Sequence, residues 1–201
     1  MNSREYSAGI VKCSFWFAEF RKVIQLLNDG NSMDEIKSLN QDSNIFSAVS
    51  SARATQIFKS VSSRVSHLDN SLIQLFRRNE LATQKLIVLI SIMNTDRLFF
   101  EFVHEVYFEQ IVMGNIELPD RDLRIFFKNK QVQSEKVAGW SDYTLKRLGD
   151  CYKTLLTEAG ILDHTPGNRK IIKHIFNMEL EHQLKHQGMA IYVRILTGVS
   201  I

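Results

Sequence analysis

The chain has 201 residues, of which 44% are apolar and 23% are charged. These values are close to those of an average globular protein, which excludes general disorder and a fibrous repeat, and the length allows one sizeable core or two small ones. The net charge of +3 is unevenly spread: residues 1–80 hold 10 basic and 8 acidic side chains, residues 81–118 hold 2 and 5, and residues 119–175 hold 11 and 7. We therefore expect two compact modules that face anions, joined by a structural connector.

The first module, residues 1–80, is predicted to be helical because its apolar residues recur at intervals of three and four. An amphipathic helix over Phe15–Leu27 is expected to end at Gly30. Ser32 and Glu35 have the spacing of a capping box, which begins a short second helix. A longer third helix is predicted from about Val49 to Leu68, burying Val49, Ala52, Ile57, Val61, Val65 and Leu68. A short middle helix before a longer one is typical of a helix-turn-helix.

The connector, residues 81–118, is predicted to hold two adjoining helices, Ala82–Met93 and Thr95–Met113. Asn94 or Thr95 is expected to cap the second helix. Pro119 stands where the first turn of a helix tolerates proline, so it marks a boundary.

The second module, residues 119–176, is predicted to contain helices at Asp120–Asn129, Ser134–Gly139 and Ser141–Ala159. Two pieces that favour β-structure follow, Ile161-Leu162 and Arg169–Phe176, around the turn residues 164–168. Three helices and then a hairpin is the order of a winged helix. Residues 177–201 are predicted to add helices at about 178–185 and 190–196.

The predicted fold class is therefore mainly α. It consists of an N-terminal helical bundle with helix-turn-helix character, followed by a C-terminal winged-helix-like module with a short β-hairpin.

Cysteine usage and hydropathy bear on the compartment. Cys13 and Cys151 are the only cysteines and are expected to be small buried residues, and residues 1–7 hold no apolar signal core. The most apolar run, Leu86–Met93, is far shorter than the roughly 20 residues of a membrane span. We expect a cytoplasmic protein without a membrane partner.

Motifs that would indicate catalysis are absent from the sequence. It holds no phosphate-binding glycine loop, nucleophile elbow, paired-cysteine zinc site or HExxH helix. Two Glu-x-x-His pairs, Glu101–His104 and Glu179–His182, supply half the ligands of a di-iron bundle, but the glutamates nearest to Glu101 in the sequence lie on the same helix. We expect no enzyme activity, no catalytic or metal-binding residue, no cofactor and no small-molecule substrate.

A stripe of polar side chains follows one face of the helix predicted at 49–68. Its members recur at intervals of 3, 4, 3 and 4, and they are Arg53, Gln56, Ser60, Ser63 and His67, flanked by Lys59 and Arg64. In a DNA major groove arginine pairs with guanine and glutamine with adenine, while lysine and serine hold phosphates. The pattern fits DNA binding and an ordinary solvated helix face equally well.

The second module gives a stronger indication of nucleic-acid binding. Ser141 is expected to cap the helix 141–159, and a capped N-terminus attracts phosphate. The side chains expected to face outward from this helix are Tyr143, Thr144, Lys146, Arg147 and Lys153. The predicted hairpin adds Arg169, Lys170 and Lys173, so basic residues lie on both elements that a winged helix uses.

Over nearly its whole length the chain resembles the BrxA family of BREX (bacteriophage exclusion) systems. The ordered strings that carry this resemblance are Tyr6-Ser7-Ala8-Gly9, Phe15-Trp16-Phe17, Ser51-Ala52-Arg53-Ala54, Thr83-Gln84-Lys85-Leu86-Ile87-Val88-Leu89, Asp96-Arg97-Leu98-Phe99-Phe100-Glu101-Phe102, Phe126-Phe127, Trp140-Ser141-Asp142-Tyr143-Thr144 and Leu156-Thr157-Glu158-Ala159-Gly160-Ile161-Leu162.

The resemblance implies a small non-catalytic protein, with helix-turn-helix and winged-helix elements, that binds double-stranded DNA in an anti-phage defence system. It also implies other BREX components as partners. The first bundle is similar to a fold seen in a transcription antitermination factor, which leaves RNA binding as an alternative. A second alternative is a scaffold that holds other BREX subunits, and a metal-dependent enzyme is the least favoured.

Overall fold

A computed structural model of the chain describes residues 5–165 and 168–199, and most of these residues are helical, as predicted. A 3-10 turn η1 (Gly9–Lys12) precedes the helices α1 (Phe17–Asn28), α2 (Met33–Ser43) and α3 (Ser51–Val65). The predicted capping box at the start of α2 is present: the Ser32 amide donates to Glu35 Oε2 at 2.7 Å, and the Glu35 amide donates to Ser32 Oγ at 3.2 Å.

The third helix begins later than predicted because Ser50 caps it. The Arg53 amide donates to Ser50 Oγ at 3.2 Å, so Val49 lies outside the helix and is 97% exposed. Ala52 is also exposed, so the predicted burial of these two residues was wrong. A further helix, α4 (Asn70–Arg78), was not predicted and is capped by the side chain of Asp69.

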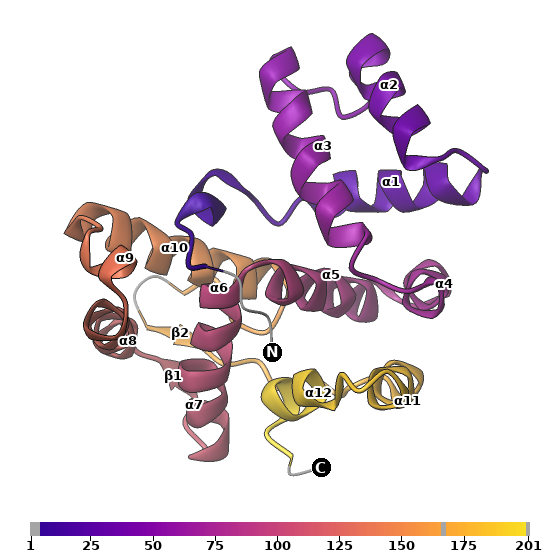
Figure 1. Cartoon of the computed structure of the whole chain (residues 1–201). Coiled ribbons are helices and arrows are strands. Elements are labelled where there is room, and N and C mark those ends of the chain that lie inside the picture. The colour runs from indigo at the N-terminus through magenta and orange to yellow at the C-terminus, as the bar shows by residue number, and fades with distance from the viewer. Residues whose placement is uncertain (1–4, 166–167, 200–201) are drawn as a thin grey trace.

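The connector is a buried helix followed by a rod. Helix α5 (Leu81–Thr95) is apolar on nearly all sides, and in Figure 1 it lies between α1–α3 at one end of the molecule and α8–α10 at the other. The rod consists of α6 (Arg97–Phe102), a π-helical turn η2 (Val103–Tyr107) and α7 (Phe108–Val112). Asp96 caps the rod, not Asn94 or Thr95, since its Oδ1 accepts from the Phe99 amide at 2.9 Å.

The connector ends in an unpredicted strand, β1 (Glu117–Leu118). The helices that follow are the predicted ones: α8 (Asp120–Gln133), α9 (Glu135–Ala138) and α10 (Asp142–Glu158). After α10 the chain forms a second short strand, β2 (Arg169–Lys170). It pairs with β1 in antiparallel register, with Leu118 opposite Arg169.

The predicted hairpin is reduced to one bridge between Leu162 and Ile171. The residues after β2 divide their backbone hydrogen bonds between two segments. The Ile171 amide donates to the Ile116 carbonyl at 2.8 Å, and the Ile172 amide donates to the Ile161 carbonyl at 3.0 Å. A regular two-stranded ladder over 169–176 therefore does not form. Pro166 and Gly167 of the predicted turn lie outside the described residues.

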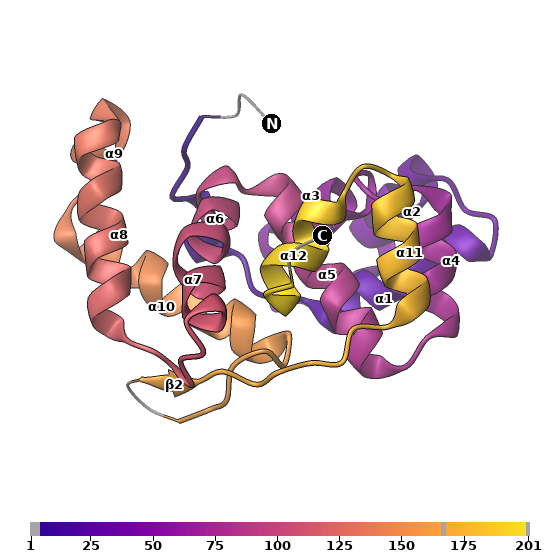
Figure 2. The ribbon, with the colours of Figure 1, turned by 90° about the horizontal axis from the view of Figure 1, so that it is seen from below.

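The last two helices are the predicted ones, α11 (Met178–His186) and α12 (Ala190–Thr197). Helix α11 contacts α4, and α12 contacts α7, so the end of the chain covers both the first module and the connector (Figure 2). The buried side chains form one continuous cluster, in which Phe99 and Phe102 pack against Tyr152 with ring centroids 5.0 and 5.1 Å apart. The division of the chain at 80, 118 and 176 stays a prediction.

Candidate nucleic-acid interface

The polar stripe predicted on α3 lies against the N-terminal segment of the chain. Arg53 Nη1 donates to the Lys12 carbonyl at 3.2 Å and to Gln56 Oε1 at 2.9 Å, and Gln56 Nε2 donates to the same carbonyl at 3.0 Å. The Arg53 guanidinium also lies 5.1 Å from the centre of the Trp16 ring. These two side chains are half-buried and hold another part of the chain, so they are not free donors for base edges.

Arg64 was predicted to contact DNA, but it is buried inside the protein. Its residue is only 3% exposed, and its guanidinium donates to the Phe15 carbonyl at 2.8 Å and to the Ser14 carbonyl at 3.0 Å. The reason is helical geometry: Arg64 follows the buried Val61 by three residues and therefore lies on the same face. Of the other predicted residues on α3, Lys59 and Ser63 are exposed and Ser60 is half-buried.

Helix α10 exposes most of the predicted residues of its first two turns to solvent. Ser141 caps the helix as predicted, accepting from the Thr144 amide at 3.3 Å, while Thr144 itself is half-buried. Tyr143 is 70% exposed, and the Arg147 guanidinium lies 5.9 Å from the centre of its ring. Lys146 is also exposed. The structure therefore brings an aromatic side chain and two cations together beside a capped helix N-terminus.

Two basic residues of the second module face inward, against prediction. Lys153 is buried, with its Nζ 2.7 Å from Asp120 Oδ1 and 3.7 Å from Asp150 Oδ1. Arg169 is half-buried, and its Nη1 donates to the Lys153 carbonyl at 3.0 Å and to Thr157 Oγ1 at 2.5 Å. Lys153 faces inward because it lies on the face of α10 that contacts α8, and Arg169 does so because β2 lies beside α10. They tie β2 and α8 to that helix.

The remaining predicted residues, Lys170 and Lys173, are exposed. Lys170 lies opposite Glu117 in the strand register, and its amide donates to Asp163 Oδ1 at 2.8 Å. Two carboxylates therefore offset part of its charge. No ion pair to Lys173 is found in the part of the chain that the structure describes.

A groove of about 400 Å³ between α8 and α10 was missed from the sequence. Its apolar lining consists of Leu123 and Phe127 of α8 and Leu145 and Gly149 of α10. Its charged and polar lining residues are Asp120, Arg124, Lys128, Gln131, Asp142, Lys146, Asp150 and Lys153. Each helix contributes positions i, i+3, i+4, i+7, i+8 and i+11, which is one helix face. That mixture of apolar and basic residues on single faces is the sequence pattern that could have revealed the groove.

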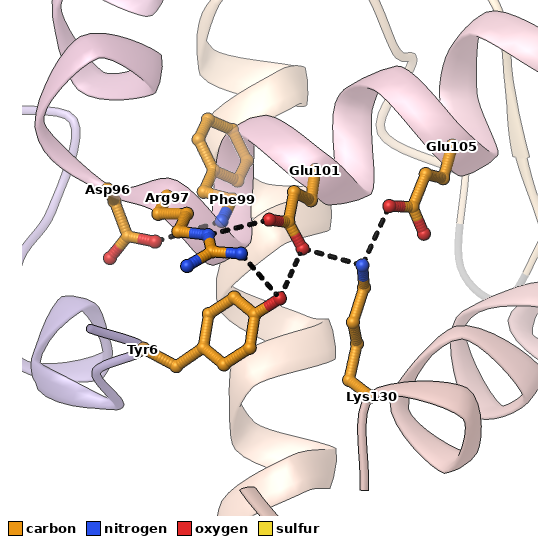
Figure 3. A network of polar contacts seen from close by, with 7 residues as sticks. All are labelled: Tyr6, Asp96, Arg97, Phe99, Glu101, Glu105 and Lys130. Carbon is orange, nitrogen blue, oxygen red and sulfur yellow. Dashed lines mark hydrogen bonds and ion pairs between the residues drawn. The ribbon is translucent and has the colours of Figure 1, made fainter. Parts of the chain in front are cut away.

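A partly buried network of polar contacts surrounds Glu101, the glutamate of the first Glu-x-x-His pair (Figure 3). Glu101 Oε2 accepts from Lys130 Nζ at 2.5 Å and from the Tyr6 hydroxyl at 2.7 Å, and Oε1 accepts from Arg97 Nε at 2.8 Å. Lys130 Nζ also lies 2.7 Å from Glu105 Oε1.

This network accounts for the glutamate without a metal ion. His104 points elsewhere, with its ring 5.9 Å from that of Phe100 and 6.0 Å from that of Phe108. Over residues 5–165 and 168–199 there is no cluster of three or more His, Cys, Asp or Glu side chains suited to a metal ion.

The two cysteines are free and half-buried. The Cys151 thiol lies 3.4 Å from the Ile10 carbonyl oxygen, and burial raises the pKa of this thiol to about 11, with the nearby Cys13 and Asp96 acting in the same direction. Cys151 is therefore a neutral thiol near pH 7 and serves as a contact between α10 and the N-terminal segment. Among the described residues, no helix combines the length and the apolar character of a membrane span.

Known proteins match nearly the whole chain. A sequence model of the BrxA family matches residues 4–188. The chain is 42% identical over 193 residues to the BREX protein BrxA of Bacillus cereus (strain H3081.97), covering 96% of both chains. The structure is similar to the crystal structure of an uncharacterized protein from Magnetospirillum magneticum, with a TM-score of 0.80 at 19% identity, covering 98% of this chain and 100% of the other. This last likeness concerns the fold alone.

Proposed function

Because the chain belongs to the BrxA family, we propose that it is a non-catalytic component of a BREX anti-phage defence system and that it binds double-stranded DNA in the cytoplasm. The BREX role rests on the family. The DNA-binding role rests on one observation, the exposed first turns of α10, where Tyr143, Lys146 and Arg147 stand beside the Ser141 cap. Free amide groups and exposed cations at a helix N-terminus suit a phosphate backbone.

The order of elements in residues 117–171 supports the same proposal. Helices α8, α9 and α10 are followed by a returning strand, β2, that pairs with β1 and bridges back to Leu162. In a winged helix the longer last helix reads the major groove, with its N-terminal residues towards the base edges. In this arrangement α10 is the recognition helix, and Lys173 follows the returning strand, where it reaches the adjacent phosphate backbone.

The corrected placements narrow the interface. Arg64, Lys153 and Arg169 are engaged inside the protein, and Arg53 and Gln56 hold the N-terminal segment. The interface therefore centres on α10 and the segment after β2, and α3 contributes at most Lys59 and Ser63 as phosphate contacts. With so few side chains able to reach bases, the protein binds duplex DNA with little sequence preference.

A salt titration of duplex binding tests this proposal. Affinity for a labelled duplex should fall steeply as salt rises, because each phosphate contact releases counterions. The double variant Arg147→Glu/Lys173→Glu should bind more weakly, with a salt slope lower by about two units, one for each lost contact. The matched control, Lys22→Glu/Lys37→Glu, changes two exposed lysines of α1 and α2 and makes the same change in net charge.

Three results would contradict the proposal: no duplex binding at low salt, binding that is insensitive to salt, or equal affinity and slope in the two double variants. Single-stranded DNA and RNA of the same sequence complete the comparison. Tighter binding of RNA than of duplex DNA would favour the RNA-binding alternative.

A further inference from the structure

The groove between α8 and α10 shares Lys146 with the DNA-facing side chains, and its other lining residues lie outside that set. Its shape follows from the way the two helices meet. At one end the ion pair between Lys153 and Asp120 joins the second half of α10 to the start of α8. Next to it Gly149 allows close approach, since a Cβ there would lie 3.2 Å from Leu123 Cδ2. The groove extends from this contact towards Gln131 and Asp142, near the opposite ends of the two helices.

The charges on the two walls are unbalanced. Lys153 pairs with both Asp120 and Asp150, and its single positive charge offsets one of these two carboxylates. Within the described residues, no ion pair is found for three cations of the groove, Arg124, Lys128 and Lys146. Among the lining carboxylates of that part of the chain, Asp142 alone has no ion pair. The groove therefore combines an apolar floor with a net positive rim.

The residues that line the groove suit an extended ligand better than a small one. Sites for small molecules hold a few polar groups that converge on the ligand. Here Leu123, Phe127, Leu145 and Gly149 supply no side-chain polar atom, and the charges lie on the walls. Each helix lines the groove over eleven residue steps, about 16 Å at the rise of an α-helix. That length accommodates about three turns of another helix.

We propose that this groove is a docking site for an acidic amphipathic helix of a partner protein, with apolar side chains on the floor and carboxylates beside Arg124, Lys128 and Lys146. Helices of this kind anchor through residues at i, i+3 or i+4 and i+7. The complementary charge favours such a partner over a neutral or basic one. Lys146 belongs to the groove and is unchanged in Arg147→Glu/Lys173→Glu, the variant that tests DNA binding. Each proposal can therefore fail without the other.

The probe is a fluorescein-labelled, hydrocarbon-stapled peptide of three to four turns, with leucines at i, i+4, i+7 and i+11 and glutamates at the positions that flank this leucine stripe. A second peptide has serine in place of each leucine and carries the same charge. Fluorescence anisotropy with the full chain should show saturable binding of the leucine peptide and none of the serine peptide. Arg124→Glu/Lys128→Glu should weaken binding at least about tenfold, since two attractions become repulsions. Lys146→Glu should weaken it from the other wall.

The controls separate this site from the DNA interface. Arg147→Glu/Lys173→Glu and Lys22→Glu/Lys37→Glu should bind the leucine peptide as the unmodified chain does. All substituted residues are exposed, and thermal melts of each variant should match the unmodified protein.

The inference is overturned by the absence of saturable binding, by equal binding of the serine peptide, or by unchanged affinity in Arg124→Glu/Lys128→Glu. It is also overturned if that variant loses duplex DNA and the leucine peptide does not bind, because the groove would then belong to the DNA surface.

Discussion

Replacing Lys130 by methionine removes the cation at the centre of the partly buried network in Figure 3 and leaves an unbranched side chain that is one heavy atom shorter. Lys130 is 3% exposed, and its partners Glu101 and Glu105 have side chains that are 13% and 44% exposed. A hydrogen bond to a charged group contributes about 1.5–3 kcal/mol, and a half-exposed ion pair at most about 1 kcal/mol. We therefore expect Lys130→Met to lower the free energy of unfolding by about 2–4 kcal/mol.

Two neighbours limit this loss. Glu101 keeps its hydrogen bonds from Arg97 and Tyr6, so the variant does not leave an unpaired buried charge. Equilibrium unfolding in urea measures the change, and a melting temperature lower by about 2–4 °C for each kcal/mol is expected for a chain of this size. In a double-mutant cycle with Glu101→Gln, the two substitutions should show a coupling energy above about 0.5 kcal/mol.

The same network should respond to acid. Burial raises the pKa of Glu101, but hydrogen bonds from Lys130, Arg97 and Tyr6 outweigh it, so the pKa lies below its ordinary value. A lowered pKa stabilises the fold above the ordinary glutamate value, about 4.3, and this stabilisation is lost as pH falls through the lower folded value. The penalty of Lys130→Met should therefore shrink in acid. A penalty under about 0.5 kcal/mol near pH 7, with no coupling to Glu101→Gln, would refute the reasoning, because the desolvation of Lys130 would then cancel its attractions.

Three further predictions concern other parts of the fold. Burial raises the pKa of Asp96 to about 6, so the folded protein should lose stability as pH rises from about 4 to 6. The variant Asp96→Asn keeps the oxygen that accepts from the Phe99 amide, and its urea unfolding should lack this decline. Gly198→Ala should lower the stability of the fold more than Gly30→Ala. Both glycines have positive φ (75° and 93°), but only the Cβ added at Gly198 would clash, at 2.5 Å from Ile111 Cγ2. Equal thermal melts of the two variants would contradict this. Metal analysis of protein purified without added metal should find no stoichiometric iron or zinc, whereas one or two ions per chain would contradict the non-catalytic assignment.

The sequence by itself determined most of the helices and their caps. The capping box at Ser32, the cap at Ser141 and the helices at 178–186 and 190–197 are local features, since spacing along the chain decides them. The family resemblance is likewise a property of ordered strings of residues, and the comparison over residues 4–188 confirms it.

Tertiary structure decided which polar side chains face solvent. Three cations of the polar pattern contact acceptors on other segments. Arg64 donates to the carbonyls of residues 14 and 15, Lys153 pairs with Asp120, and Arg169 donates to Thr157. No periodicity along α3 or α10 reveals an acceptor carried by another segment. The same holds for strand β1, whose two residues pair only because β2 returns beside them.

The groove between α8 and α10 shows the same division. The sequence determined one mixed apolar and basic face on each helix, while only packing brought the two faces together around Gly149. Spacing along the chain determines which residues share a face, because a helix repeats every 3.6 residues. Contacts between segments far apart in sequence decide whether that face is covered, paired or left open to a partner.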